Sequence, residues 1–238
     1  MLIPRFTYSK FIRYVPRYEC IKIECPRYIR NGGIWDILGF YEPKTEMVIV
    51  CEDRIVKHGR RLANQLKVDE LKTTLVLREL VRLHEHSHAY LHTAQIAEHV
   101  KAACLRVINM EELNKDTWLF DLKPQVLEPL TELFAYITLK NTHILNKEEK
   151  NFVMRIFEEV DKQTPNYYQK WRDIINLIPL DSEFSIIALL YIARSKVWSS
   201  WSEFYNFISG IDFNRLKKAY VLMRLALDRL KDLRFLRI

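Results

Sequence analysis

Residues 84 to 88 read His-Glu-His-Ser-His, and this segment has the residue types and spacing of a metal site. Two histidines four residues apart lie on one face of a helix, about 6 Å apart along its axis, so both imidazoles can reach one metal ion. Glu85 projects beside that face, where a carboxylate can take a proton from a metal-activated water molecule. The motif His84-Glu85-x-x-His88 therefore predicts a metal site with a general base.

The residues before the motif predict the helix that this spacing requires. Asp69 is a candidate N-cap, and no Gly or Pro interrupts the run that follows. Apolar residues recur there at helical spacing, at Leu71, Leu75, Leu80 and Val81. We expect one helix from Asp69 to about Leu91. The alternative is a solvated face rich in histidine, to which His86 and His92 would also belong.

A catalytic zinc site needs a third protein ligand and keeps a fourth position for water or substrate. The segment Leu127–Leu139 predicts a second helix that begins at Pro129, since proline is favoured at the first helical position. Glu132 lies one turn into this helix and is the preferred third ligand. Glu128 is the alternative ligand, but it precedes a proline, which favours a capping role. Either glutamate could instead serve only the helix dipole.

The motif followed by Glu132-x-x-Ala135-Tyr136 resembles the gluzincins, the HExxH metallopeptidases whose third ligand is a glutamate on a later helix. The resemblance covers residues 39 to 140 and implies one Zn²⁺ per chain, bound by His84, His88 and Glu132. It also implies that Glu85 is the general base and that Tyr136 lies beside the site. Counted from Glu128 instead, Glu132 falls where thermolysin-like enzymes have an acid behind their ligands.

Other parts of the resemblance are less complete. His92 extends the motif to His-Glu-x-x-His-x-x-x-His, which is similar to the ImmA/IrrE peptidases, and we expect it to hydrogen-bond near the ligands rather than bind metal. The segment from Gly39 to Cys51 predicts two strands, which in gluzincins lie at the sheet edge and pair with extended substrate. Thr93 to Val126 would be an inserted helical segment. The donor that stabilises the transition state is left open among Tyr136, His143, Tyr167 and Tyr168.

The order of the predicted elements favours an α+β fold, with a small, mainly antiparallel N-terminal sheet followed by a predominantly helical, zincin-like domain. The chain has 238 residues, of which 49% are hydrophobic, enough for a substantial core. We expect a metallopeptidase core at residues 1–145 and a helical C-terminal lobe at 146–238.

The N-terminal residues, the longest apolar run and the cysteines indicate the cellular compartment of the protein. Met1 to Arg5 lacks the features of a secretory signal, and the longest apolar run, Ile186 to Ala193, is too short to span a bilayer. We therefore expect a cytoplasmic protein with no membrane partner. The four cysteines, which form no Cys-x-x-Cys pair, are expected to be free buried thiols. The composition leans towards a thermophilic source, in which a disulfide is the alternative.

The net charge of +7 is concentrated near the end of the chain, with eight Lys or Arg residues between Arg215 and Ile238. An amphipathic helix of this kind usually packs its apolar stripe on the core and exposes its charges. We expect a zinc-dependent peptidase acting on a peptide or protein substrate. The alternative is a non-catalytic zincin-like protein whose basic lobe binds a protein partner or nucleic acid, of which nucleic acid is not favoured.

Overall fold

The computed structural model describes residues 12–13, 18–22, 25, 38–108, 122–141, 144–179 and 183–235, with only the backbone at 12–13, 18–22, 183, 224 and 226–235. The chain forms two compact units. Unit 1 holds the described residues within 14–94 and 127–172, and unit 2 holds those within 8–13, 95–126 and 173–238. Unit 1 thus continues past residue 145, where we expected the boundary, and the segment 95–126 belongs to unit 2.

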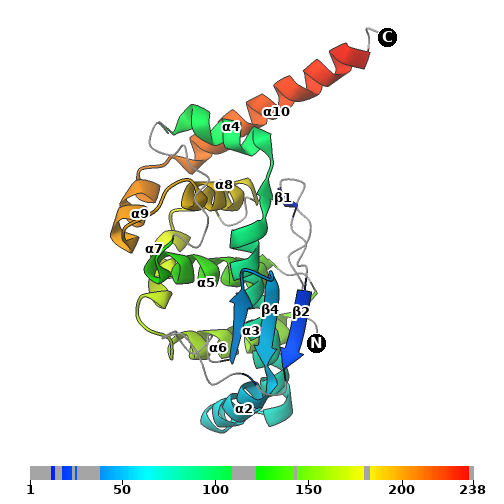
Figure 1. The fold of residues 1–238 in the computed structure, drawn as a ribbon, viewed down its shortest axis with the longest axis vertical. Helices are drawn as coiled ribbons and strands as arrows, with labels where there is room; N and C mark the ends of the chain where they lie inside the picture. Colours follow the sequence, from blue (N-terminus) through cyan, green and yellow to red (C-terminus); the bar gives the residue numbers. More distant parts are fainter. Residues whose placement is uncertain are drawn as a thin grey trace. The chain divides into compact units, whose positions relative to one another are not determined.

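Unit 1 contains a three-stranded sheet in the order β2-β4-β3 (Figure 1). Its strands are β2 (Tyr18–Lys22), β3 (Gly39–Glu42) and β4 (Met47–Cys51). The pair β3–β4 is antiparallel and forms the two expected strands between Gly39 and Cys51, but β2 runs parallel to β4. This sheet is therefore mixed rather than mainly antiparallel. The α+β class is confirmed, because helices form most of the remaining described chain.

Unit 1 contains the helix that was predicted to begin at Asp69, together with others. Its helices include α2 (Glu52–Leu66), α3 (Glu70–Thr93) and α6 (Lys147–Asp161), together with the 3₁₀-helix η2 (Tyr168–Lys170) and α7 (Trp171–Ile175), which begins at the end of the unit. The Asp69 side chain caps α3 by accepting a hydrogen bond from the Lys72 amide at 2.6 Å. Strands β3 and β4 pack on α3, so the sheet supports the helix that carries the HExxH motif.

Helix α5 (Pro124–Asn141) begins five residues before the expected start at Pro129. Pro124 occupies the first helical position, where the missing amide proton has no partner to lose. Pro129 lies inside the helix, although it cannot donate the usual hydrogen bond to Gln125. The consequence is that Glu128 has helical backbone, so Glu128 and Glu132 lie on one helix face.

Two cysteines form a disulfide, which corrects the expectation that all four are free. Cys25 is bonded to Cys51, with their Cα atoms 5.6 Å apart. Lys22 pairs with Cys51 across β2 and β4, so Cys25, three residues beyond the strand, comes back beside it. Cys104 is a free buried thiol, as expected, and burial raises its pKa to about 12. The side chain of Cys20 lies outside the described residues.

Unit 2 is mainly helical. Its short strands β1 (Ile12–Arg13) and β5 (Gln95–Ile96) pair antiparallel, and its helices are α4 (Glu98–Val107), α8 (Glu183–Arg194), α9 (Trp201–Ser209) and α10 (Phe213–Phe235). The expected helical segment from Thr93 to Val126 thus contains, among its described residues, a short strand before helix α4. Helices α4, α8 and α10 pack together.

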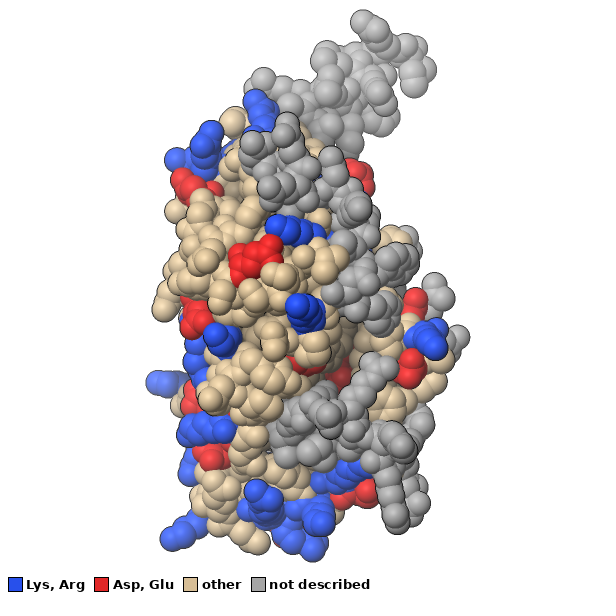
Figure 2. Space-filling model, turned by 60° about the vertical axis from the view of Figure 1, so that its left-hand side comes forward, with Lys and Arg blue, Asp and Glu red and all other residues tan. Residues whose placement is uncertain are grey.

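The basic end of α10 falls outside the described side chains beyond Leu225. On the face in Figure 2, Lys and Arg are interspersed with Asp and Glu. Within the described part of the chain, every helix is too short or too polar to cross a bilayer.

Candidate metal centre

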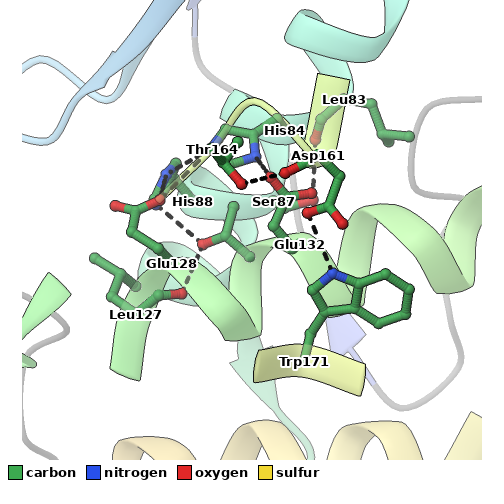
Figure 3. A network of polar contacts seen from close by, with 11 residues as sticks. Leu83, His84, Ser87, His88, Leu127, Glu128, Glu132, Asp161, Thr164 and Trp171 are labelled. Atoms are coloured by element: carbon green, nitrogen blue, oxygen red, sulfur yellow. Dashed lines mark hydrogen bonds and ion pairs between the residues drawn. The ribbon is translucent and has the colours of Figure 1, made fainter. Parts of the chain in front are cut away.

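Two helices of unit 1 bring the candidate site together (Figure 3). Helix α3 supplies His84, Glu85 and His88 from a stretch in which every residue from Leu80 to Leu91 is buried. Helix α5 supplies Glu128 and Glu132, also buried. Because both pairs have i, i+4 spacing, each helix presents its two ligand candidates on one face.

The two imidazoles and the Glu128 carboxylate form a triangle of donor atoms. The Nε2 atoms of His84 and His88 are 3.2 Å apart, and Oε2 of Glu128 lies 3.6 Å from the first and 3.3 Å from the second. Tetrahedral zinc with bonds of about 2.0–2.2 Å has ligand atoms about 3.3–3.6 Å apart. The edges of the observed triangle are close to these values, so the three residues could hold a metal ion.

The charges in this cluster are strongly coupled. Burial acts to lower the pKa of both histidines, but Glu132 and Glu128 outweigh it at His84, and Glu128 outweighs it at His88. Both histidine pKa values are therefore raised. Burial alone would raise the pKa of Glu128, yet His88 and His84 lower it to about 2. Glu128 is thus an anion, and a bound cation would take the place of the imidazole protons.

The second nitrogen of each imidazole faces α5. Nδ1 of His84 lies 3.3 Å from Oε1 of Glu132, and Nδ1 of His88 lies 3.2 Å from the hydroxyl of Thr131. The Tyr168 ring also stacks on the His84 ring, with an angle of 19° between their planes. The Nδ1 atom of each imidazole therefore has a partner on α5, and the two Nε2 atoms point at each other and at Glu128.

Behind Glu132 lies a second buried carboxylate, Asp161 (Figure 3). Asp161 accepts hydrogen bonds from Nε1 of Trp171, at 3.5 Å, and from the guanidinium of Arg172. Burial raises the pKa of Asp161 although Arg172 opposes it. Burial also raises the pKa of Glu132, against the effect of His84, and Asp161 adds to this rise. Glu132 therefore lies between an imidazole and an anchored carboxylate.

Glu85 is buried beside the histidines, and its charge contributes to raising the pKa of both. Strand β3 lies directly against it, because Gly39 has no side chain. A Cβ atom at residue 39 would lie 2.7 Å from Cγ1 of Val81, 2.8 Å from the Ile49 carbonyl oxygen and 3.2 Å from Cγ of Glu85. The position of the predicted general base thus depends on a glycine in the neighbouring strand.

The remaining predicted residues lie in other surroundings. Nδ1 of His92 is 2.6 Å from the hydroxyl of Tyr41, a residue of β3. The Tyr136 ring packs against Trp171, with ring centroids 4.6 Å apart, and belongs to an aromatic cluster with Phe157. The predictions for His92 and Tyr136 therefore stay untested, and His143 lies outside the described residues.

Sequence reasoning missed Thr131 and Asp161. The only sequence signal for Thr131 is its place between two glutamates that were candidate ligands. Asp161 carries no such signal, because it comes from the end of α6 and reaches the site only through the tertiary fold.

Comparison with known protein families, curated proteins and solved structures gave no match to this chain. The site must therefore be interpreted from its own geometry. It combines two imidazole nitrogens, a carboxylate oxygen and a neighbouring buried carboxylate, a donor set that suits a transition metal such as zinc.

Proposed function

We propose that the protein is a zinc-dependent metallopeptidase of the gluzincin type, with a zincin-like unit 1. His84, His88 and Glu128 bind one Zn²⁺, and Glu85 is the general base. The observation that carries the proposal is the buried triangle of donor atoms, whose edges of 3.2, 3.3 and 3.6 Å match a tetrahedral ion. Three protein ligands leave the fourth position for water or substrate, as catalysis requires.

A buried ion-paired cluster without metal is the simplest alternative. Removing several ionisable groups from water costs free energy that their mutual attraction only partly returns. Packing alone would be served as well by apolar residues at these positions. A cluster of two histidines and a glutamate, with Glu85 beside it, is better accounted for by a bound cation.

Each side chain has a distinct role in the proposed reaction. Bound zinc would lower the pKa of a water molecule and polarise the carbonyl group of the substrate. Glu85 accepts a proton from the attacking water and then donates it to the leaving nitrogen as the C–N bond breaks. Because Glu85 starts and ends the cycle as a carboxylate, no further acid is needed.

Glu132, the ligand preferred from the sequence, takes a different role in this proposal. Its carboxylate faces Nδ1 of His84 at 3.3 Å, whereas Glu128 faces both Nε2 atoms. An outer carboxylate that accepts the Nδ1 proton fixes the tautomer of a metal-binding histidine and increases its basicity. We therefore assign the third ligand to Glu128 and the orientation of His84 to Glu132.

The substrate is proposed to be an extended peptide. Among the described strands, β3 ends the three-stranded sheet, and Gly39 brings β3 against Glu85. A peptide that adds to a sheet edge is held by main-chain hydrogen bonds, which need no particular side chains. Pairing with β3 would therefore bring a peptide bond near the general base without strict sequence specificity.

Metal analysis combined with hydrolysis of denatured casein tests the proposal. The wild-type protein should hold one zinc per chain and cleave casein. Glu85→Gln should keep the zinc and lose at least about 100-fold in rate, since general-base catalysis contributes about 10²–10⁴-fold. Glu70→Gln, on the exposed start of α3, is the matched control and should retain the activity.

Two results would contradict the proposal. One is a wild-type protein that binds no zinc, and the other is a Glu85→Gln variant as active as the wild type. Zinc binding without hydrolysis, together with salt-sensitive binding of nucleic acid, would instead favour a non-catalytic zincin-like protein.

A further inference from the structure

Thr131 is fully buried in α5, and its hydroxyl is shared between two groups. The oxygen lies 3.0 Å from the carbonyl oxygen of Leu127, one turn earlier, and 3.2 Å from Nδ1 of His88. A threonine hydroxyl has one proton to donate and two lone pairs that accept. Its two neighbours therefore determine the direction of both hydrogen bonds.

The Leu127 carbonyl oxygen can only accept, so it receives the single hydroxyl proton. The Thr131 oxygen must then accept from His88, which places a proton on Nδ1 of that imidazole. Within the described chain, this hydroxyl is the hydrogen-bond partner of Nδ1. The lone pair of a neutral His88 is consequently on Nε2, the atom that faces His84 and Glu128.

We infer that Thr131 is a positioning residue that holds His88 in the tautomer and orientation needed for metal binding, an inference that rests on the proposed zinc site. It acts on His88 as Glu132 acts on His84, but with a neutral oxygen. Two adjacent residues of α5 thus orient the two histidines of α3. Glu128, one turn earlier on the same helix face, supplies the third ligand.

The same helix offers a matched control for this role. Thr138 also donates its hydroxyl proton to the carbonyl one turn earlier, that of Phe134, at 2.9 Å. It is part-buried, and among the described residues no histidine contact accompanies that bond. Replacing either threonine by valine removes a hydroxyl and its bond to the backbone while keeping the shape of the side chain. Only Thr131→Val should affect the metal.

Zinc affinity, measured by competition with a chromophoric chelator, tests the inference without relying on hydrolysis. Thr131→Val should weaken zinc binding about 10–100-fold, the usual effect of removing an outer partner of a metal-binding histidine. Thr131→Ser retains the hydroxyl and should bind within a few-fold of the wild type, as should Thr138→Val. Circular dichroism of the metal-free variants checks that each is folded.

Three outcomes would overturn the inference. Unchanged affinity in Thr131→Val means that the hydroxyl does not position His88. Equal weakening in Thr131→Ser and Thr131→Val means that packing, not hydrogen bonding, is responsible. A wild-type protein without zinc ends the proposed function together with this inference. A wild type that binds zinc and cleaves casein, beside an unaffected Thr131→Val, ends the inference alone.

Discussion

Helix α2 packs against α3 in unit 1, yet α2 and the second half of α3 bury different kinds of residue. Helix α2 is amphipathic: its buried residues, Ile55, His58, Gly59, Leu62 and Ala63, lie on one face, and its charged residues point away from the core. In α3, all residues from Leu80 to Leu91 are buried, and among them are Arg82 and five consecutive polar residues, from His84 to His88.

This difference distinguishes a helix that serves only packing from a helix segment that carries a candidate site. Burying a polar group costs free energy unless it is hydrogen-bonded, and burying a charge costs more. A helix needed only for packing keeps most such groups on its exposed face, as α2 does with the exception of His58. In the polar stretch of α3, His84 and His88 have their partners on α5, whereas Arg82 and Ser87 are bonded within α3. We therefore expect substitutions in the two regions to have different consequences.

The largest effect is expected from Glu128→Ala. Because this change removes a ligand, zinc should fall from one per chain to a small fraction in protein dialysed against micromolar zinc. Glu132→Gln should stay loaded, with affinity reduced at most about 10–100-fold, since its amide oxygen can still accept from His84. Elemental analysis of the zinc content of both variants checks which substitution has the larger effect. Loss of zinc in Glu132→Gln but not in Glu128→Ala would restore Glu132 as the third ligand.

A smaller effect, a loss of hydrolysis rate without loss of zinc, is expected from Gly39→Ala, which acts on the site through strand β3. The added methyl group would lie 3.2 Å from Cγ of Glu85 and 2.7 Å from Cγ1 of Val81, so β3 and Glu85 must move apart. A displacement of about 1 Å can cost about 100-fold in rate. Casein hydrolysis should fall by that order while zinc content stays constant, and undiminished hydrolysis would mean that the position of Glu85 does not depend on Gly39.

On α2, Gly59→Ala should change stability alone. A Cβ atom there would lie 2.4 Å from Oγ1 and 2.9 Å from Cα of Thr74 on α3, so the two helices must separate slightly. Overpacking costs about 1–3 kcal/mol, partly offset by the better helix propensity of alanine, for a net loss of about 1 kcal/mol. Urea unfolding measures this loss, and zinc affinity should be unchanged.

Gly210→Ala is the control for that substitution. Residue 210 has a φ of −81°, and the nearest atom to an added Cβ is 3.5 Å away. The change should therefore leave stability unaltered or slightly increased. A drop in the zinc affinity of Gly59→Ala would mean that the packing of α2 also affects the metal site, contrary to the distinction between the two regions.

The smallest effect is expected at an exposed cluster in unit 2. Hydrogen bonds from Lys196 and Ser199 lower the pKa of Glu203 to about 2. A carboxylate whose pKa is lower in the folded than in the unfolded protein stabilises the fold above its unfolded pKa, and this stability is lost as pH falls towards 2. Because solvent screens the pair, we expect only about 0.5 kcal/mol. Urea unfolding at pH 7 and pH 2.5 should show that Glu203→Gln costs less at the lower pH.

The sequence predicted the helices whose ends are determined by neighbouring residues. The helix with the HExxH motif follows from its cap at Asp69 and its apolar spacing, and α6 (Lys147–Asp161), in the region expected to be helical, begins at an Asn146–Glu149 capping box. These features act within a few residues of each other, so no tertiary information is needed.

The errors came from features that depend on distant residues. The prediction that α5 begins at Pro129 was wrong, because Pro124 occupies the first helical position and Pro129 lies inside the helix. That error made Glu128 a cap and ranked Glu132 above it as the ligand. The Cys25–Cys51 bond and the role of Asp161 were missed for the same reason, since each depends on strands or helices that meet only in the folded chain.

The donor triangle draws on two helices that are far apart in the sequence, and this gives a bound ion a mechanical as well as a chemical effect. An ion held by both α3 and α5 is a reversible cross-link, and its binding energy adds to the stability of the fold. Free zinc at a thousand times its dissociation constant would raise the free energy of unfolding by about 4 kcal/mol. Resistance to heat and to added proteases should therefore vanish with EDTA and return with zinc.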